Sequence, residues 1–267
     1  MQFKRVVVDK DISPLISTDM TRCIHCSRCV RFGEEISNVK ELGLLNRGED
    51  MKIDVFIESG VTSELSGNMI DLCPVGALNN KPYRYKARTW DLKQICGISP
   101  HDCIGSNINY HTYNNKILRA VPSENPEINQ TWLSDRDRFG YEGIYSQDRA
   151  EKTLVKVDGK LVELDFNSMP SQVSDLINSN IKKYGQEKIG CLISGQSTSE
   201  ELFLFQKILK GLGVSNIDHR TKESDFSYQN SYPIMPSLGC NLNEIEQYKN
   251  IILVGVNIKK EYPVLSI

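Results

Sequence analysis

The pattern of hydrophobic and polar positions divides the chain into three regions, and the first covers residues 1–87. Hydrophobic runs in this region are short and turns are frequent. Residues 30–36 have the spacing of a short helix, residues 42–45 and 53–57 are typical of strands, and residues 67–72 lead into a cysteine. Because elements this short bury little hydrophobic surface, the pattern predicts a region that needs a cross-link or a bound metal for stability.

The second region, residues 88–145, is predicted to be a small, mainly β module. It contains two short apolar stretches, IGSNINYHTY and KILRAVP, and turn-forming residues separate them at Asn114-Asn115. A further turn signal lies at residues 122–126, which begin and end with proline.

The third region, residues 146–267, has the longer pattern of an α/β fold. Residues 189–193 are predicted to form a buried strand, and residues 251–256 a second one. Ser197 and Glu200 have the spacing of a capping box, which predicts a helix that begins there. One face of this helix is predicted to carry the recurring apolar residues Leu202, Phe205, Leu209 and Leu212, and Gly211 and Gly213 supply a stop signal.

Composition and charge exclude several classes of protein. The chain has 267 residues, of which 39% are hydrophobic and 25% charged, so it is neither collagen-like, low-complexity nor a coiled coil. The formal net charge of -2 provides no overall cationic field for nucleic acid or anionic lipid. The longest apolar run near the end, residues 251–256, is far shorter than the roughly 20 residues of a membrane-spanning helix.

The cysteines carry the main chemical signal. The first residues lack the apolar segment and cleavage site of a secretory signal, so a reducing compartment is expected. Eight cysteines are too few for a disulfide scaffold in a chain of this length, and half of them are grouped. In a reducing compartment, such grouping indicates a metal site.

The grouped cysteines have the spacing of a 4Fe-4S site. Cys23, Cys26 and Cys29 form CIHCSRC, and Cys73 stands directly before Pro74 in DLCPVGAL. A 4Fe-4S cluster needs four thiolates in tetrahedral array, and a CxxCxxC loop with one remote Cys-Pro supplies them. A four-cysteine zinc site usually has paired CxxC knuckles instead, so zinc is the less favoured alternative.

Three residues beside these cysteines have two interpretations each. Four thiolates complete the ligand shell, so His25 is expected to be a neighbour or an outer hydrogen-bond donor and not a ligand. Arg22 and Arg28 either raise the potential of the cluster by favouring its more negative reduced state or are solvated surface charges.

Four segments of the chain resemble the large iron-sulfur subunit of respiratory complex I, which is the 75 kDa subunit of NADH-quinone oxidoreductase. They are MTRCIHCSRCVRFGEEIS, LGLLNRGE, SELSGNMIDLCPVGAL and WLSDRDRFGYEG. The resemblance implies an α+β ferredoxin-like 4Fe-4S region over residues 1–87 and a small, mainly β module over residues 88–145. The start of an α/β molybdopterin-oxidoreductase-like domain follows over residues 146–267. Cys23, Cys26, Cys29 and Cys73 would bind one 4Fe-4S cluster, and no residue is expected to be catalytic.

Two departures from the family pattern change the expectations. Residues 1–22 contain no Cys or His for the family's earlier iron-sulfur centres, so the chain is expected to be an internal fragment or the product of a split gene. Aligned on the cluster motif of catalytic molybdopterin enzymes, the second region carries no thiolate at the four ligand positions, and Cys96 and Cys103 are out of register. The second region is therefore expected to hold no cluster, and the third no molybdenum cofactor. The four positions are Ser99, Asp102, Ser106 and Ser134.

The resemblance implies electron transfer within a larger enzyme. The chain would relay electrons from NADH and flavin toward quinone and would have no active site of its own. Expected partners are the flavin- and NADH-binding subunit and the downstream iron-sulfur subunits, without nucleic acid. The complex would lie at the cytoplasmic face of a bacterial inner membrane, or on the mitochondrial matrix side, and the chain would meet the membrane only through the complex. The alternatives are a catalytic molybdopterin oxidoreductase similar to formate dehydrogenase and a structural zinc protein.

Overall fold

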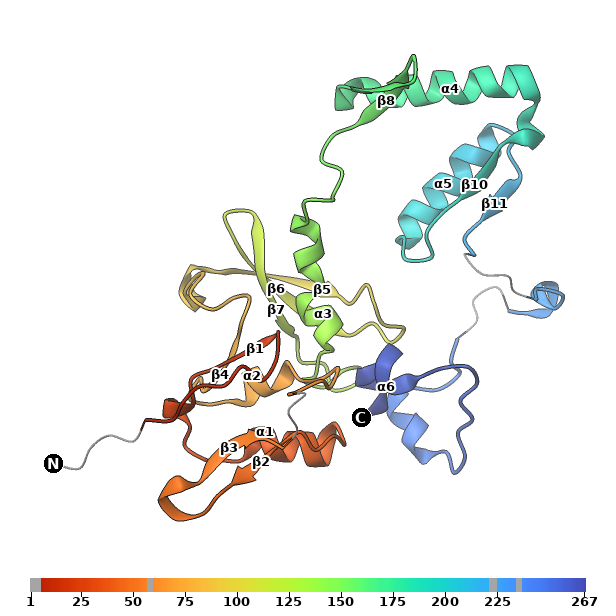
Figure 1. The fold of residues 1–267 in the computed structure, drawn as a ribbon. Coiled ribbons are helices and arrows are strands. Elements are labelled where there is room, and N and C mark those ends of the chain that lie inside the picture. Colours follow the sequence, from red (N-terminus) through yellow and green to blue (C-terminus); the bar gives the residue numbers. More distant parts are fainter. Residues whose placement is uncertain (1–5, 57–59, 221–224, 234–236) are drawn as a thin grey trace. The chain divides into compact units, whose positions relative to one another are not determined.

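A computed structural model describes residues 6–56, 60–220, 225–233 and 237–267 of the chain (Figure 1). The chain forms two compact units. The first, which we call the cysteine unit, comprises residues 1–146 together with residues 238–267. The second, residues 147–237, is called the α/β unit. Each unit is described by itself.

The first region of the cysteine unit contains two small antiparallel sheets and short helices. Strand β1 pairs with β4, and β2 pairs with β3. Helix α1 continues directly as a π-helical turn, and helix α2 ends at Leu72, directly before Cys73. The bounds are β1 Ile16–Thr18, α1 Arg28–Arg31, the π-helical turn Phe32–Ile36, β2 Leu42–Leu45, β3 Lys52–Val55, α2 Asn68–Leu72 and β4 Leu78–Asn80. The strand predicted at residues 53–57 thus ends at Val55, and residue 57 lies outside the described residues.

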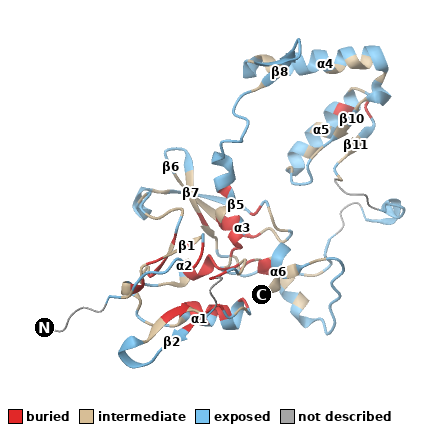
Figure 2. Cartoon of the chain, viewed as in Figure 1, coloured by how far each residue is buried: buried red, intermediate tan, exposed pale blue. Residues whose placement is uncertain are grey.

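A hydrophobic core holds these short elements together. Its members come from both sheets and both helices, and Figure 2 shows the buried residues around α1 and α2. Val264, from the end of the chain, packs in the same core, and Lys260 forms an ion pair of 2.7 Å with Glu64. Core residues that are at most 5% exposed are Ile16, Phe32, Leu42, Ile53, Val61, Leu65, Met69, Ala77 and Leu78.

The second region is a three-stranded antiparallel sheet in the order β5-β6-β7, as the mainly β pattern predicted. Asn114 and Asn115, the predicted turn, connect β6 to β7 and both have the left-handed φ that such a turn requires. Helix α3 covers the sheet beside a small core that includes Ile108 and Leu133. The bounds are β5 Lys93–Ile98, β6 Asn107–Tyr113, β7 Lys116–Pro122 and α3 Asp135–Phe139.

Buried polar contacts join α3 to α2. Asp135 accepts hydrogen bonds from Ser66 Oγ and from the backbone N–H of Gly67, both at 2.6 Å. Arg138 is 1% exposed and its Nη2 lies 2.6 Å from Oδ2 of Asp71. Because α2 leads directly to Cys73, these contacts position one of the four predicted cluster ligands.

The α/β unit contains a hairpin, two longer helices and a pair of parallel strands. β10 and β11 are parallel and α5 forms the connection between them, which is the βαβ arrangement. Leu202, Phe205 and Leu209, on the face predicted from the sequence, are less exposed than the other side chains of α5, and Leu212 directly follows the helix. The bounds are β8 Leu154–Val157, β9 Lys160–Glu163, α4 Met169–Tyr184, β10 Gly190–Leu192, α5 Ser199–Gly211 and β11 Asn216–Asp218.

Three expectations for the third region need correction. The cap of α5 is Thr198 with Glu201, one residue beyond the predicted pair, and both hydrogen bonds of the capping box are present. β10 forms where predicted, but Leu192 is 65% exposed, so the strand is not buried. Residues 251–256 do not form a strand, and Ile252 and Val254 are each 85% exposed. A hydrophobic run becomes a strand only when a neighbouring strand satisfies its backbone, and the described residues supply none there.

The end of the chain returns to helical structure. A short helix, α6, spans Ile258–Glu261. Within the described ranges, none of the helices combines the length and apolar character needed to cross a membrane.

Candidate iron-sulfur centre

The loop from Cys23 to Cys29 turns sharply because two of its residues adopt left-handed backbone conformations. His25 has φ of 55° and Ser27 has φ of 59°. Ser27 is also the N-cap of α1, so Cys29 lies in the first turn of that helix, and it is 8% exposed. These turns place Cys23, Cys26 and Cys29 around one cavity.

Cys73 reaches the same cavity because a sheet joins the two cysteine segments. β1 runs toward Cys23, and β4 begins shortly after Cys73. The two strands are antiparallel, with Thr18 opposite Leu78, and the backbone N–H of Asp19 donates to the carbonyl of Ala77 at 2.8 Å. The sheet therefore brings together ligands that are far apart in sequence.

The cavity is lined by all four cysteines and is otherwise mainly apolar. Its other lining residues are Met20, Ile24, Arg28, Ile53, Val75, Ala77 and Leu78. Burial raises the pKa of the Cys29 thiol to about 11, and the proximity of Cys23, Cys73 and Cys26 adds to this effect. Binding of iron would have to displace the proton of this thiol, so metal binding at this cavity is linked to proton release.

The protein donors at the cavity are four cysteine thiols. In the described part of the chain, no three His, Cys, Asp or Glu side chains are arranged to hold a metal ion. A zinc ion binds thiolates at about 2.3 Å, so its four sulfur atoms would lie within about 4 Å of one another. An iron-sulfur cluster is held by thiolates around the outside of a larger core, and four cysteines around one cavity match that donor set.

One hydrogen bond to a cysteine sulfur was not predicted from the sequence. The backbone N–H of Ala77 donates to Sγ of Cys73 at 3.2 Å. Gly76 makes this turn possible, because its φ of 65° is a conformation that residues with a Cβ rarely adopt. The sequence VGAL carried the signal, since a glycine three residues after a cysteine lets the backbone return toward the sulfur.

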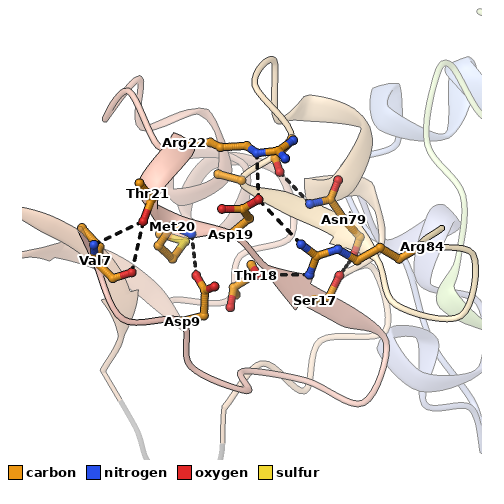
Figure 3. Close-up of polar contacts among 12 residues, drawn as sticks. Val7, Asp9, Ser17, Thr18, Asp19, Met20, Thr21, Arg22, Asn79 and Arg84 are labelled. Carbon is orange, nitrogen blue, oxygen red and sulfur yellow. Dashed lines mark hydrogen bonds and ion pairs between the residues drawn. The ribbon is translucent and has the colours of Figure 1, made fainter. Parts of the chain in front are cut away.

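A network of charged side chains borders the cysteine loop, and Figure 3 shows it in close-up. The carboxylate of Asp19 lies 2.7 Å from Nε of Arg22 and 3.6 Å from Nη2 of Arg84. Asp19 therefore balances the charge of Arg22, which does not line the cavity, whereas Arg28 does. His25 is not among the lining residues either.

The four positions at which the second region matches a cluster motif come together in one polar network. Asp137 accepts from Oγ of Ser99 at 2.5 Å and from Oγ of Ser134 at 2.8 Å. Asp102 accepts from the hydroxyl of Ser106 and from a backbone N–H. The backbone N–H of Asp102 in turn donates to Ser99 Oγ at 3.2 Å, which links the two halves. The sequence predicted these four positions but not Asp137, which is 3% exposed.

Burial dominates the electrostatics of this network. It raises the pKa of Asp137, although the hydrogen bonds from Ser99 and Ser134 oppose the shift. Cys96 and Cys103 are both exposed and take no part in the network. The side chains of this network are hydroxyls and carboxylates that form hydrogen bonds with one another.

Each of the three regions contains a segment that matches a known protein family. Residues 13–79 match the NADH-quinone oxidoreductase subunit 3, ferredoxin-like domain. Residues 92–142 match the NADH-ubiquinone oxidoreductase NDSU1/NuoG-like, 4Fe-4S domain. Residues 149–267 match the molybdopterin oxidoreductase family. These matches confirm the predicted fold class: ferredoxin-like 4Fe-4S domains followed by the start of a molybdopterin-oxidoreductase domain.

Several relatives of the chain are subunits of NADH-quinone or NADH-ubiquinone oxidoreductases. It is 37% identical over 263 residues to the G subunit of NADH-quinone oxidoreductase from Rickettsia felis. It is also 37% identical to the NADH-ubiquinone oxidoreductase 75 kDa subunit of Reclinomonas americana. The mitochondrial NADH dehydrogenase [ubiquinone] iron-sulfur protein 1 of Solanum tuberosum is 40% identical over 81% of this chain.

The chain is thus homologous, over 98% of its length, to part of the large iron-sulfur subunit of NADH-quinone oxidoreductase, the bacterial G or mitochondrial 75 kDa subunit. This confirms the resemblance identified from the four sequence segments. The chain spans 38% of the length of the Rickettsia felis protein and 39% of the Reclinomonas americana protein. Neither a catalytic molybdopterin enzyme nor a zinc protein is favoured by these relatives.

Proposed function

We propose that this chain is an electron-transfer element of NADH:quinone oxidoreductase, in which Cys23, Cys26, Cys29 and Cys73 bind one 4Fe-4S cluster. The observation that carries the proposal is the convergence of these four cysteines on one mainly apolar cavity. The match of residues 13–79 to a ferredoxin-like domain supports the same assignment.

The protein's own residues would bind the cluster and set its environment. Such a cluster supplies one-electron oxidation and reduction, and the protein controls its potential through hydrogen bonds to sulfur, charge and solvent exposure. The Ala77 N–H directed at Cys73 Sγ stabilises negative charge on that sulfur and thereby favours the reduced state. Arg28 adds positive charge at the cavity, and the apolar lining limits the access of water.

The relatives support a place for the chain within the complex. Electrons would come from NADH through the flavin- and NADH-binding subunit and continue through downstream iron-sulfur subunits to quinone. The chain would have no active site of its own and would be a peripheral part of the complex. The complex would lie at the cytoplasmic face of a bacterial membrane or on the mitochondrial matrix side.

The proposal also covers the other two regions. The hydrogen-bonded side chains of Ser99, Asp102, Ser106 and Ser134 provide no thiolate, so the second region would be structural and hold no cluster. The third region would hold no molybdenum cofactor. One cluster per chain is therefore expected.

Metal analysis of anaerobically reconstituted protein tests these assignments. We expect about four irons and four acid-labile sulfides per chain, as one 4Fe-4S cluster requires, with neither zinc nor molybdenum. Cys73→Ala should lose most of the iron, whereas Cys103→Ala, the matched control at an exposed cysteine outside the cavity, should keep it. Electron paramagnetic resonance of the dithionite-reduced protein should show the signal of one reduced cluster.

Three results would contradict the proposal. Full iron content in Cys73→Ala would remove the ligand assignment. Zinc without sulfide would make the site structural and end the electron-transfer function. About eight irons per chain would place a second cluster in residues 88–145.

A further inference from the structure

Strand β5 has an open hydrogen-bonding edge. It is the outer strand of its sheet and pairs on one side with β6. Just beyond the strand, the backbone N–H of Ser99 donates to the carbonyl of Ser106 at 2.8 Å. Because hydrogen-bonded pairs alternate along an antiparallel ladder, the backbone groups of Gln94, Cys96 and Ile98 point away from β6. Within the described ranges, no backbone partner meets them.

This edge lacks the features that usually protect an outer strand from pairing. Natural edge strands are shielded by proline, bulges, several charges or a covering element. β5 contains no proline and a single charge, Lys93, and the sheet's irregularity lies between β6 and β7. Two of its apolar side chains are in contact with solvent, Ile95 at 55% and Ile98 at 65% exposure. An unshielded strand of this kind pairs readily with another extended chain.

The segment that leads into β5 is basic and aromatic. Residues 81–93 contain five Lys or Arg and one acidic residue. Lys81 and Arg84 form ion pairs with aspartates of the first region, whereas no ion pair within the described residues involves Lys86, Arg88 or Lys93. Trp90, 80% exposed, lies beneath the guanidinium of Arg88. The uncompensated charge around the edge is therefore positive.

We infer that the open edge of β5 is a docking site for an extended, acidic segment of a partner protein, which adds a fourth strand to the sheet. The backbone groups of Gln94, Cys96 and Ile98 supply the new ladder. Lys93 and the basic segment before it select acidic side chains on the incoming strand, and Ile98, on the opposite face of β5 from Lys93, covers its apolar ones. This inference concerns a surface separate from the cysteine cavity and holds whether or not a cluster binds there.

The test uses the full chain and an end-blocked seven-residue peptide of alternating glutamate and valine. Tryptophan fluorescence is recorded during titration, and Trp90→Phe identifies the part of the signal that comes from this exposed side chain. We expect a saturable blue shift that weakens with salt, and no shift with the lysine-valine peptide of the same length.

Two variants connect the binding to the edge. Cys96→Pro removes one outward N–H without touching the ladder to β6, since proline is tolerated at such positions of edge strands. It should weaken binding about threefold to tenfold, the value of one backbone hydrogen bond, whereas the control Cys96→Ser should bind as the native chain does. Lys93→Glu should weaken binding by a similar factor. Far-UV circular dichroism of each variant verifies that the sheet is retained.

Several outcomes would overturn the inference. They are the absence of a saturable shift at millimolar peptide, equal binding of the lysine peptide, and native affinity in Cys96→Pro. Sedimentation analysis tests whether a second copy of this chain occupies the edge instead. A native chain that is dimeric and a Cys96→Pro variant that is monomeric would assign the edge to that second copy.

Discussion

The contact between α2 and α3 predicts that Asp135→Ala destabilises the cysteine unit and weakens cluster binding. Asp135 is 7% exposed and accepts from Ser66 Oγ and from the N–H of Gly67 at 2.6 Å each. Gly67 is the residue before α2, and Cys73 directly follows the last residue of α2. Removal of the carboxylate therefore loosens the element that positions this cysteine.

The magnitude follows from the two donors that lose their acceptor. A buried donor without a partner costs about 1–3 kcal/mol, so the two donors together cost about 2–6 kcal/mol. Part of this loss is offset, because burial raises the pKa of Asp135 and the mutation removes that unfavourable desolvation. We expect a net loss of about 3 kcal/mol, which at about 2–4 °C per kcal/mol lowers the melting temperature of the cysteine unit by about 6–12 °C.

Thermal unfolding by circular dichroism, with iron content after reconstitution, provides the assay. Only the transition of the cysteine unit should shift, because Asp135 lies in that unit. Asp175→Ala is the matched control, since Asp175 is an exposed aspartate on α4 of the α/β unit. Asp135→Asn retains one oxygen acceptor and should fall between the native chain and Asp135→Ala. An unchanged melting temperature in Asp135→Ala would refute the reasoning.

Two further predictions address other parts of the chain. Burial alone would raise the pKa of Asp54, but its hydrogen bonds with Lys10 and Lys52 outweigh this effect and lower it below the ordinary value of 3.8. The stabilisation from these ion pairs is therefore present above pH 3.8 and lost as the pH falls through the lower folded-state value. In urea unfolding, the free energies of unfolding of the native chain and of Asp54→Asn should thus differ at pH 7 and converge below pH 3.8. A difference in free energy that is constant with pH would contradict the lowered pKa of Asp54. Thr198→Ala should cost the α/β unit about 1 kcal/mol, measured by the same method, whereas Ser197→Ala should leave it unchanged. A loss of stability in Ser197→Ala with none in Thr198→Ala would instead support Ser197, the N-cap predicted from the sequence.

The elements that were predicted correctly are those set by local sequence. The strand predicted at residues 42–45 matches β2, and the turn at Asn114-Asn115 forms because asparagine tolerates the left-handed conformation. The cap of α5 was misplaced by one residue because STSEE contains two overlapping capping boxes, and spacing alone does not choose between them.

Elements that depend on distant partners were not predictable to the same degree. The hydrophobic run at residues 251–256 indicated a buried strand, but a run of this kind does not specify which strand it will pair with. Likewise, the Cys-Pro motif predicted that Cys73 is a ligand, but the sequence did not reveal how that cysteine approaches the loop of Cys23. The pairing of β1 with β4 provides the approach, and neither strand stood out in the hydrophobic pattern.

The polar network of the second region explains how this fold is stable with hydroxyls and carboxylates at the four positions that align with the cluster motif. A site of this kind without a cluster would leave buried polar groups without hydrogen-bond partners, and each such group would cost about 1–3 kcal/mol of folding free energy. Here the oxygens of Asp137 accept from Ser99 and Ser134, and the oxygens of Asp102 accept from Ser106 and a backbone N–H. Ser99 and Ser134 thus donate to a carboxylate of α3, and Ser106 donates to a carboxylate in the loop between β5 and β6. In the structural role proposed for residues 88–145, these hydrogen bonds would supply the cross-link in place of a cluster.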